Sequence, residues 1–185
     1  FLNTLFILFF FLCYSINMTE VGCLTDGHFQ NLEVDGISNL PDLTFKRNVI
    51  DLDDTTYALS VAQSGTTCVF DGTACVATLP DAAIGLEYTF VVNATGSGDQ
   101  VIRTQSSDKL SGGFFKATAA LNNTNLAAAT TVLDMASGTN DDLTMNGTTK
   151  GGVLGSTVRV VGVKANLWSV SGIVIGSSTL VTSFS

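Results

Sequence analysis

Short runs in which apolar and polar residues alternate fill most of this chain from Thr44 onward. In the run LEYTFVVN, Tyr88, Phe90 and Val92 fall on one face of an extended strand, because successive side chains point to opposite faces. The run LWSVSGIVIG, at residues 167–176, repeats this pattern. No segment keeps apolar residues at the 3.6-residue spacing of a helix over several turns. The pattern therefore predicts strands throughout, rather than alternating strands and helices.

Twelve segments of this kind can be marked along the chain, each bounded by turn residues such as Gly, Asp, Asn and Ser. They are TFKRNVIDL, TTYALSVA, TTCVF, ACVATL, LEYTFVVNA, QVIRTQ, GFFKATA, TTVLDMA, DLTMNG, STVRVVGVKA, LWSVSGIVIG and STLVTSF. The turn clusters between them include PDAAIG, TGSGD, SSDKLSGG and SGTNDD. Strands this short, with turns this frequent, are typical of sandwiches and barrels. We therefore expect an all-β fold, a compact β-sandwich or β-barrel-like domain of jelly-roll or β-tulip type.

The pattern also divides the chain into regions. Residues 44–185 are expected to form a single all-β domain. Residues 18–43 are broken into short pieces by three glycines and a proline, and we expect an extended N-terminal arm there. Within the domain, the stretch ATAALNNTNLAAA at 117–129 is compatible with a short helix or with a loop.

Residues 1–17 differ from the rest, since they hold five of the twelve phenylalanines and no charge. The run is too short for a comfortable transmembrane helix. It lacks the preceding positive charge and the small-residue cleavage site of a signal peptide. The sequence MTEVGCLTDG, which begins at Met18, is typical of the start of a soluble protein. We interpret residues 1–17 as sequence upstream of the natural start, with a signal or anchor as the alternative.

The charge balance narrows the choice of partners. The net charge is −8 and the sequence pI is about 4.3, with eight basic residues spread along the chain. These residues form no cluster that could hold phosphate groups. Nucleic acid is therefore not an expected partner.

Two cysteines enclose a tight turn signal in the stretch CVFDGTAC, where Cys68 and Cys75 flank Asp71-Gly72. If this dipeptide forms a two-residue hairpin turn, Cys68 lies directly opposite Cys75, at a separation that a disulfide bond can span. The spacing is wider than that of a Cys-x-x-Cys redox motif, and a zinc site would need further ligands. The sequence leaves two alternatives open: a disulfide bond or a pair of packed, reduced thiols.

Residues suited to catalysis are scarce. His28 is the only histidine, it lies in the arm, and no G-x-S-x-G motif is present. The pairs Asp53-Asp54 and Asp141-Asp142 lack the spaced ligands of a calcium loop. We therefore expect no enzyme, no catalytic residues, no cofactor and no metal site.

Three parts of the chain resemble small virion structural proteins of tailed bacteriophages, especially marine ones. They are QSGTTCVFDGTACVATLPDAAIGLEYTFVVNATGSGDQVIRTQSSDKLSGG, GTTKGGVLGSTVRVVGVKANLWSVSGIVIGSSTLVTSFS and LTDGHFQNLEVDG. The most specific part is LPDAAIGLEYTFVV, and the resemblance covers most of residues 20–185. It implies a capsid decoration (cement) protein, a compact β structure made in the host cytoplasm and carried on the capsid surface of the virion. The cysteine pair and the apolar leader depart from that pattern.

A decoration protein would be a non-enzymatic structural protein that binds the major capsid protein and stabilises the capsid lattice, as a homotrimer and without membrane contact. The arm between Gly27 and Gly36 could add to an exposed strand edge of a capsid subunit. Phe29, Leu32 and Val34 would then be the anchors. The equal alternative is that the arm pairs with its own sheet.

Two other functions stay open at the level of sequence. One is a receptor- or glycan-binding module of a phage fibre or spike, although no shaft repeat is present and aromatic residues are sparse outside the leader. The other is a secreted β-sandwich adhesin, which requires residues 1–17 to be a signal.

Overall fold

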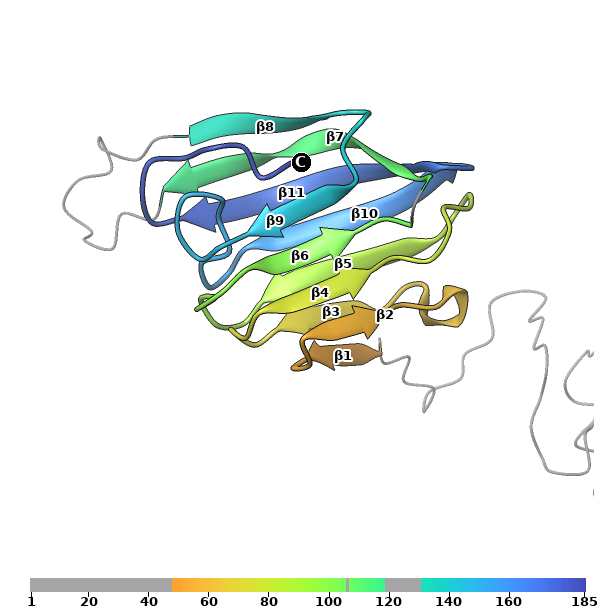
Figure 1. The fold of residues 1–185 in the computed structure, drawn as a ribbon, viewed down its shortest axis with the longest axis horizontal. Helices are drawn as coiled ribbons and strands as arrows, with labels where there is room; N and C mark the ends of the chain where they lie inside the picture. The colour runs from red at the N-terminus through yellow and green to blue at the C-terminus, as the bar shows by residue number, and fades with distance from the viewer. Residues whose placement is uncertain (1–47, 106, 119–130) are drawn as a thin grey trace, which may run out of the picture. The chain divides into compact units, whose positions relative to one another are not determined.

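The computed structural model describes residues 48–105, 107–118 and 131–185. There, eleven strands and one 3-10 turn, η1 (Val61–Gln63), form two sheets that pack face to face (Figure 1). The seven-stranded sheet has the order β1 (Val49–Leu52), β3 (Thr67–Phe70), β5 (Glu87–Val92), β10 (Thr157–Lys164), β11 (Leu167–Gly176), β7 (Lys109–Thr118) and β8 (Thr131–Ser137). The four-stranded sheet has the order β2 (Thr56–Ala58), β4 (Cys75–Thr78), β6 (Gln100–Arg103) and β9 (Asp142–Met145). The predicted all-β sandwich is confirmed.

The first six strands alternate between the two sheets. β1, β3 and β5 lie side by side and parallel in one sheet, and β2, β4 and β6 do the same in the other. A parallel pair needs a crossover connection, and here each crossover is a strand of the facing sheet. The chain therefore winds around the core as a flattened coil. A jelly roll is built from antiparallel Greek keys. The molecule is therefore a sandwich, but the order in which its strands are connected differs from that of a jelly roll.

The turn at Asp71-Gly72 joins the two sheets rather than two neighbours within one sheet. β3 pairs with β1 and β5, whereas β4 pairs with β2 and β6. The Asp71 carboxylate accepts hydrogen bonds from the backbone N–H (3.2 Å) and the hydroxyl (2.9 Å) of Thr73 at this corner. The hairpin that would set Cys68 directly opposite Cys75 therefore does not form. A turn dipeptide specifies a change of direction, but it does not specify which sheet receives the next strand.

The later strands close the sandwich with mostly antiparallel pairs. β10 pairs antiparallel with β5 and β11, β8 with β7, and β9 with β6, while β11 and β7 are parallel. Between β10 and β11 the chain reverses at Asn166, whose φ of 62° is in the left-handed region that Asn tolerates.

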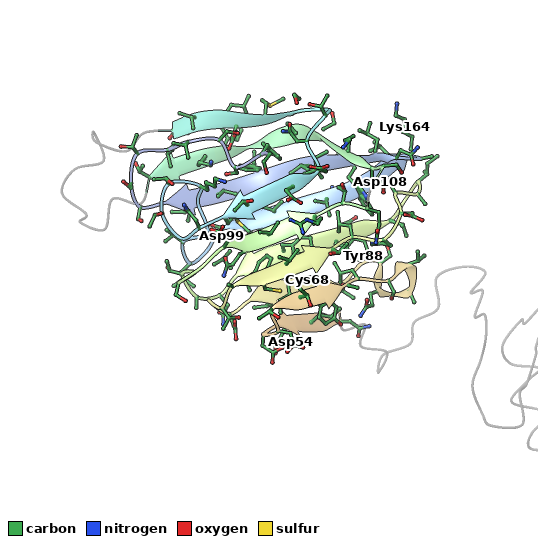
Figure 2. All side chains as sticks on the ribbon, in the orientation of Figure 1. Asp54, Cys68, Tyr88, Asp99, Asp108 and Lys164 are labelled. Carbon is green, nitrogen blue, oxygen red and sulfur yellow. The ribbon has the colours of Figure 1, made fainter. Side chains whose placement is uncertain are left out.

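The core lies between the sheets and is built from alternate residues of the strands. Tyr88, Phe90 and Val92 of β5 are all buried, as their shared face predicts. Tyr88 packs against Trp168 with ring centres 5.9 Å apart, and Phe90 stacks on Phe70 at 5.8 Å. Figure 2 places Cys68 and Tyr88 within the body of the sandwich. Such buried rings contribute much of the hydrophobic stabilisation of a domain this size.

The last residues, 181–185, cover the part of the seven-stranded sheet that the smaller sheet does not reach, and we call them the closing segment. In Figure 1 the dark blue trace after β11 returns across β7 to the end marked C. Phe184 packs on Phe114 of β7 at 5.2 Å and forms a single β-bridge to Leu143 of β9. The closing segment therefore completes the core beside β7 and β8.

A buried ion pair fixes the closing segment to the sheet. Lys116 of β7 donates hydrogen bonds to Asp134 of β8 (2.7 Å), to the Val181 carbonyl (2.7 Å) and to the Ser183 hydroxyl (2.5 Å). The Asp134 carboxylate also accepts from the Ser183 backbone N–H (2.8 Å) and the Thr182 hydroxyl (3.1 Å). Every donor of the ammonium group is thus used, as a buried charge requires.

Eleven of the twelve predicted segments contain a strand, and the exception is the last one, STLVTSF. STLVTSF, at residues 178–184, contains no strand, and its last four residues belong to the closing segment, which is held mainly by the contacts just described. The cluster SSDKLSGG was predicted as a turn, yet β7 begins within it at Lys109. The leader 1–17, the arm 18–43 and most of the ambiguous stretch 117–129 lie outside the described residues.

Candidate functional site

Both cysteines of the CVFDGTAC stretch are free thiols, and both are buried. They face the core from opposite sheets, Cys68 from β3 and Cys75 from β4. Of the two alternatives that the sequence left open, the structure therefore has the packed thiols, without a disulfide bond between them.

Burial makes both thiols poor nucleophiles. It raises the pKa of Cys68 to about 11, although a contact with the Thr66 hydroxyl partly lowers it. The pKa of Cys75 is raised by burial, and then by the negative charges of Asp54, Asp71 and Asp53. Since only the thiolate reacts, neither position is suited to redox or nucleophilic chemistry near neutral pH.

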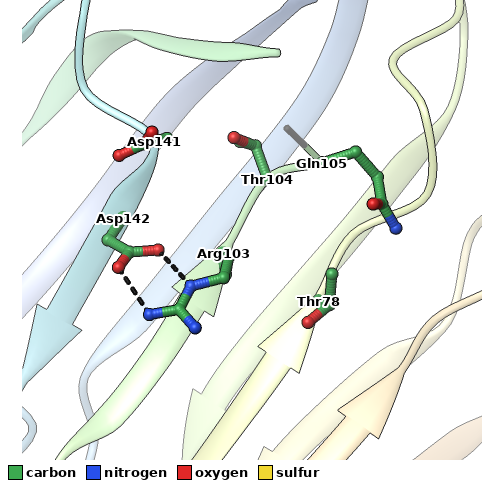
Figure 3. Close-up of a pocket in the computed structure, with 6 residues that line it drawn as sticks. All are labelled: Thr78, Arg103, Thr104, Gln105, Asp141 and Asp142. Carbon is green, nitrogen blue, oxygen red and sulfur yellow. Dashed lines mark hydrogen bonds and ion pairs between the residues drawn. The ribbon is translucent and has the colours of Figure 1, made fainter. Parts of the chain in front are cut away.

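A polar depression of about 350 Å³ lies on the outer side of the four-stranded sheet, where β4 and β6 end and β9 begins (Figure 3). The residues that line it are Thr78, Arg103, Thr104, Gln105, Asp141 and Asp142. Arg103 donates two hydrogen bonds to Asp142, at 2.8 Å and 2.7 Å, and this two-point contact raises the pKa of Arg103. Asp141 pairs with Lys109 at 3.2 Å.

The charged groups of this depression therefore neutralise one another. The guanidinium and the two carboxylates are engaged in pairs, and the Thr104 hydroxyl donates to the Asp108 carbonyl at 2.8 Å. The arrangement offers no nucleophile beside a base, which covalent catalysis would require. We interpret it as a solvated ion-pair cluster at the strand ends.

A different feature stands out on the outer face of the seven-stranded sheet. Four large apolar side chains are more than half exposed there: Ile173 (59%), Phe115 (60%), Leu133 (58%) and Met135 (55%). We call these four residues the apolar patch. Ile173 of β11 is paired with Phe115 of β7, and Phe115 with Leu133 of β8, so three of the four stand in one row across adjacent strands.

The fourth member and the neighbouring strands extend this surface. Met135 lies over Gly113, because a Cβ atom placed on that glycine would stand only 2.7 Å from the methionine sulfur. In the other direction the row continues from Ile173 through Thr157 and Val91 to Val69, each paired with the next. The patch is therefore one end of a row that crosses most of the sheet.

In the described parts of β7 and β8, the outward positions around the patch carry no charge. Between Ser111 and Ala117 the outward positions of β7 are Gly113 and Phe115, and those of β8 are hydroxyl or apolar residues. Farther along the same face, Arg159 and Glu87 neutralise each other through bonds of 2.8 Å and 2.7 Å. In a chain of net charge −8, an uncharged apolar surface of this kind is typical of a protein–protein contact.

This surface was missed at the level of sequence, although a signal was present. In β8, TVLDMAS, apolar residues occupy both alternating positions, so that some must face outward. Phe114-Phe115 in β7 has the same property, since one ring is buried and the other exposed. Alternation identifies the inward face of a strand, but it does not show which outward apolar residues the sheet brings together.

The remaining expectations concern the residues of the arm, metal binding and membrane spans. His28 and the anchors Phe29, Leu32 and Val34 lie outside the described residues. Within the described ranges, no group of three or more His, Cys, Asp or Glu side chains could hold a metal ion. Nor does any helix there have the length and apolar character needed to cross a membrane.

Comparisons with known proteins assign no family: no protein-family model, no curated protein and no solved structure matches the chain.

Proposed function

We propose that this chain is a non-enzymatic structural protein, a capsid decoration protein that binds the outside of a phage head and stabilises its lattice. The observation that carries the proposal is the apolar patch on the outer face of the seven-stranded sheet. A rigid sheet face that exposes four large apolar side chains favours binding of a protein surface over binding of an ion or a small polar molecule.

The rest of the molecule fits this role. The core is closed on the side of β7 and β8 by a segment held by a fully satisfied ion pair, which favours a rigid body. The polar depression has its charges paired, and the two buried thiols are inert. The resemblance to virion proteins supplies the identity of the assembly, with the major capsid protein as partner and the arm around Phe29, Leu32 and Val34 as a second point of attachment.

The apolar patch weighs against a glycan-binding fibre module. Among the described residues, Phe115 is the only aromatic side chain among the exposed large apolar ones. Sugar-binding surfaces need aromatic faces or convergent polar groups, and an isolated ring at the end of an aliphatic row does not provide them.

A sedimentation experiment tests the proposed function. Virus-sized particles from a lysate of producing cells are separated on a density gradient and probed with an antibody raised against residues 48–185. The chain should sediment with the particles, in a fixed ratio to the major shell protein. Recovery only in the culture medium or the free protein fraction would refute the proposal and favour the adhesin.

A double variant tests whether the apolar patch makes the contact with the particle. Phe115→Ser with Leu133→Ser should release the chain from the particles, because it removes the centre of the apolar patch. Ile84→Ser, which changes an exposed apolar residue in the loop after β4, is the matched control and should stay bound.

A further inference from the structure

The strand β8 forms one edge of the seven-stranded sheet, and among the described residues it pairs only with β7. Proteins usually protect such an edge with a lysine, a proline or a bulge, because its free N–H and C=O groups can pair with another strand. β8 has none of these, and its register with β7 is continuous. Its one charged residue, Asp134, is buried and bound to Lys116. Within the described ranges, no strand therefore covers this edge.

The outward side chains of β8 are arranged symmetrically about its centre. Leu133 and Met135 stand on either side of Asp134, and Thr131 and Ser137 stand at the two ends. An antiparallel pairing of β8 with β8 of a second copy, about a two-fold axis at Asp134, would place Leu133 opposite Met135 of the second copy. This register sets all seven residues opposite a partner residue, and any shifted register does so for fewer. At Ser137, the backbone N–H already donates to the Asn140 side chain at 2.9 Å.

From this edge we propose that a second copy of the chain docks at β8, so that the two seven-stranded sheets continue into one sheet. The pairing sets Asp134 opposite Asp134 of the second copy, but each carboxylate is buried and bound to Lys116 of its own chain. The outward positions of β8 are all uncharged. Uncharged outward positions favour this contact, because two molecules of net charge −8 each repel one another over the rest of their surfaces.

The pairing would also enlarge the apolar surface that binds the capsid. This consequence rests on the proposed function. The apolar patch exposes on the order of 500 Å² in one copy, near the upper end for a monomer. Two patches joined across the axis present on the order of 1,000 Å² on one face, the size that a specific protein–protein contact requires. A pair of this kind closes at two copies, whereas the resemblance implies three.

A charge-swap experiment on the pure, full-length chain tests the proposal. Leu133→Asp with Met135→Asp places acidic residues opposite each other across the axis, and Leu133→Lys with Met135→Lys places basic ones there. Light scattering should show each variant alone as single chains and an equimolar mixture of the two as pairs. The control Ile84→Asp should pair like the wild type, since this residue lies in the loop after β4. Thermal unfolding should confirm that all variants fold, because both substituted residues are more than half exposed.

Cross-linking tests the register. In a background with Cys13→Ser and Cys23→Ser, oxidation of a mixture of Leu133→Cys and Met135→Cys chains should give a covalent pair, more than ten-fold in excess over either variant alone. A wild-type monomer, a trimer, pairing that survives the acidic substitutions, or a mixture that does not cross-link would each overturn the proposal. These measurements use the isolated chain, so their failure is distinct from a failure to bind particles.

Discussion

Lys116 and Asp134 are both buried, and together they bind three residues of the closing segment. Replacing one partner of such a pair leaves the other charge buried without compensation. Lys116→Met should therefore lower the free energy of unfolding by about 3 kcal/mol or more, as measured by urea denaturation. Lys109→Met, which breaks the more exposed pair with Asp141, is the control and should change it by less than about 1 kcal/mol. Equal effects of the two variants would contradict this account of the buried pair.

The same pair makes stability depend on pH in the acid range. Burial raises the pKa of Asp134, but hydrogen bonds from Lys116, Ser183 and Thr182 and the charge of Lys116 outweigh burial and lower it. The stabilisation by the carboxylate is thus complete above its ordinary pKa of about 3.9 and is lost as the pH falls through the lowered value. The stability difference between the wild type and Asp134→Asn should be constant from pH 5 to 7 and shrink below about pH 4. A difference that stays constant down to pH 2 would refute this linkage.

The buried thiols give a prediction about reactivity. In a Cys13→Ser, Cys23→Ser background, a disulfide reagent such as DTNB at pH 8 should label neither Cys68 nor Cys75 in the folded chain. Both should react once the chain is unfolded in guanidinium, because burial keeps the folded thiols protonated and inaccessible. Rapid labelling of either thiol before unfolding would contradict their place in the core, and a lack of labelling after unfolding would indicate a disulfide bond.

Among the elements, the closing segment stabilises the sandwich without being a strand. Phe184 fills the space beside Phe114 and is almost fully buried. Phe184→Ala should therefore cost about 3 kcal/mol of unfolding free energy, measured by chemical denaturation. The matched control is Ile84→Ala, an exposed apolar residue whose loss should cost less than about 0.5 kcal/mol. A cost below about 1 kcal/mol for Phe184→Ala would mean that the closing segment is not part of the core.

The positions of the strands could be predicted from the sequence, but their assignment to sheets could not. Alternation is a local property, and it located β5 and β11 with their buried faces correctly. Which strands pair depends on the course of each connection, and the corner at Asp71-Gly72 sends the chain into the facing sheet. Sequence patterns that specify turns therefore did not distinguish a hairpin from a corner between sheets.

At the scale of the whole molecule, the candidate site was the least predictable part. Phe115, Leu133, Met135 and Ile173 come from three strands, and only the order β11–β7–β8 brings them together. The two cysteines, by contrast, were conspicuous in the sequence and proved to be core residues. The spacing of residues in the sequence reveals a site only where the residues of that site are close together in the chain. A surface for assembly depends instead on the pairing of strands that are distant in the sequence.

In the assembly that we propose, this acidic sandwich contacts protein through the apolar patch and the edge strand β8. The most direct test is the solution mass of the full chain, measured by light scattering on a sizing column over a wide range of concentrations. We expect a particle of two chains of 19.3 kDa each. A single chain at every concentration would contradict the assembly of this protein through β8, and three chains would favour the arrangement that the resemblance to virion proteins implies.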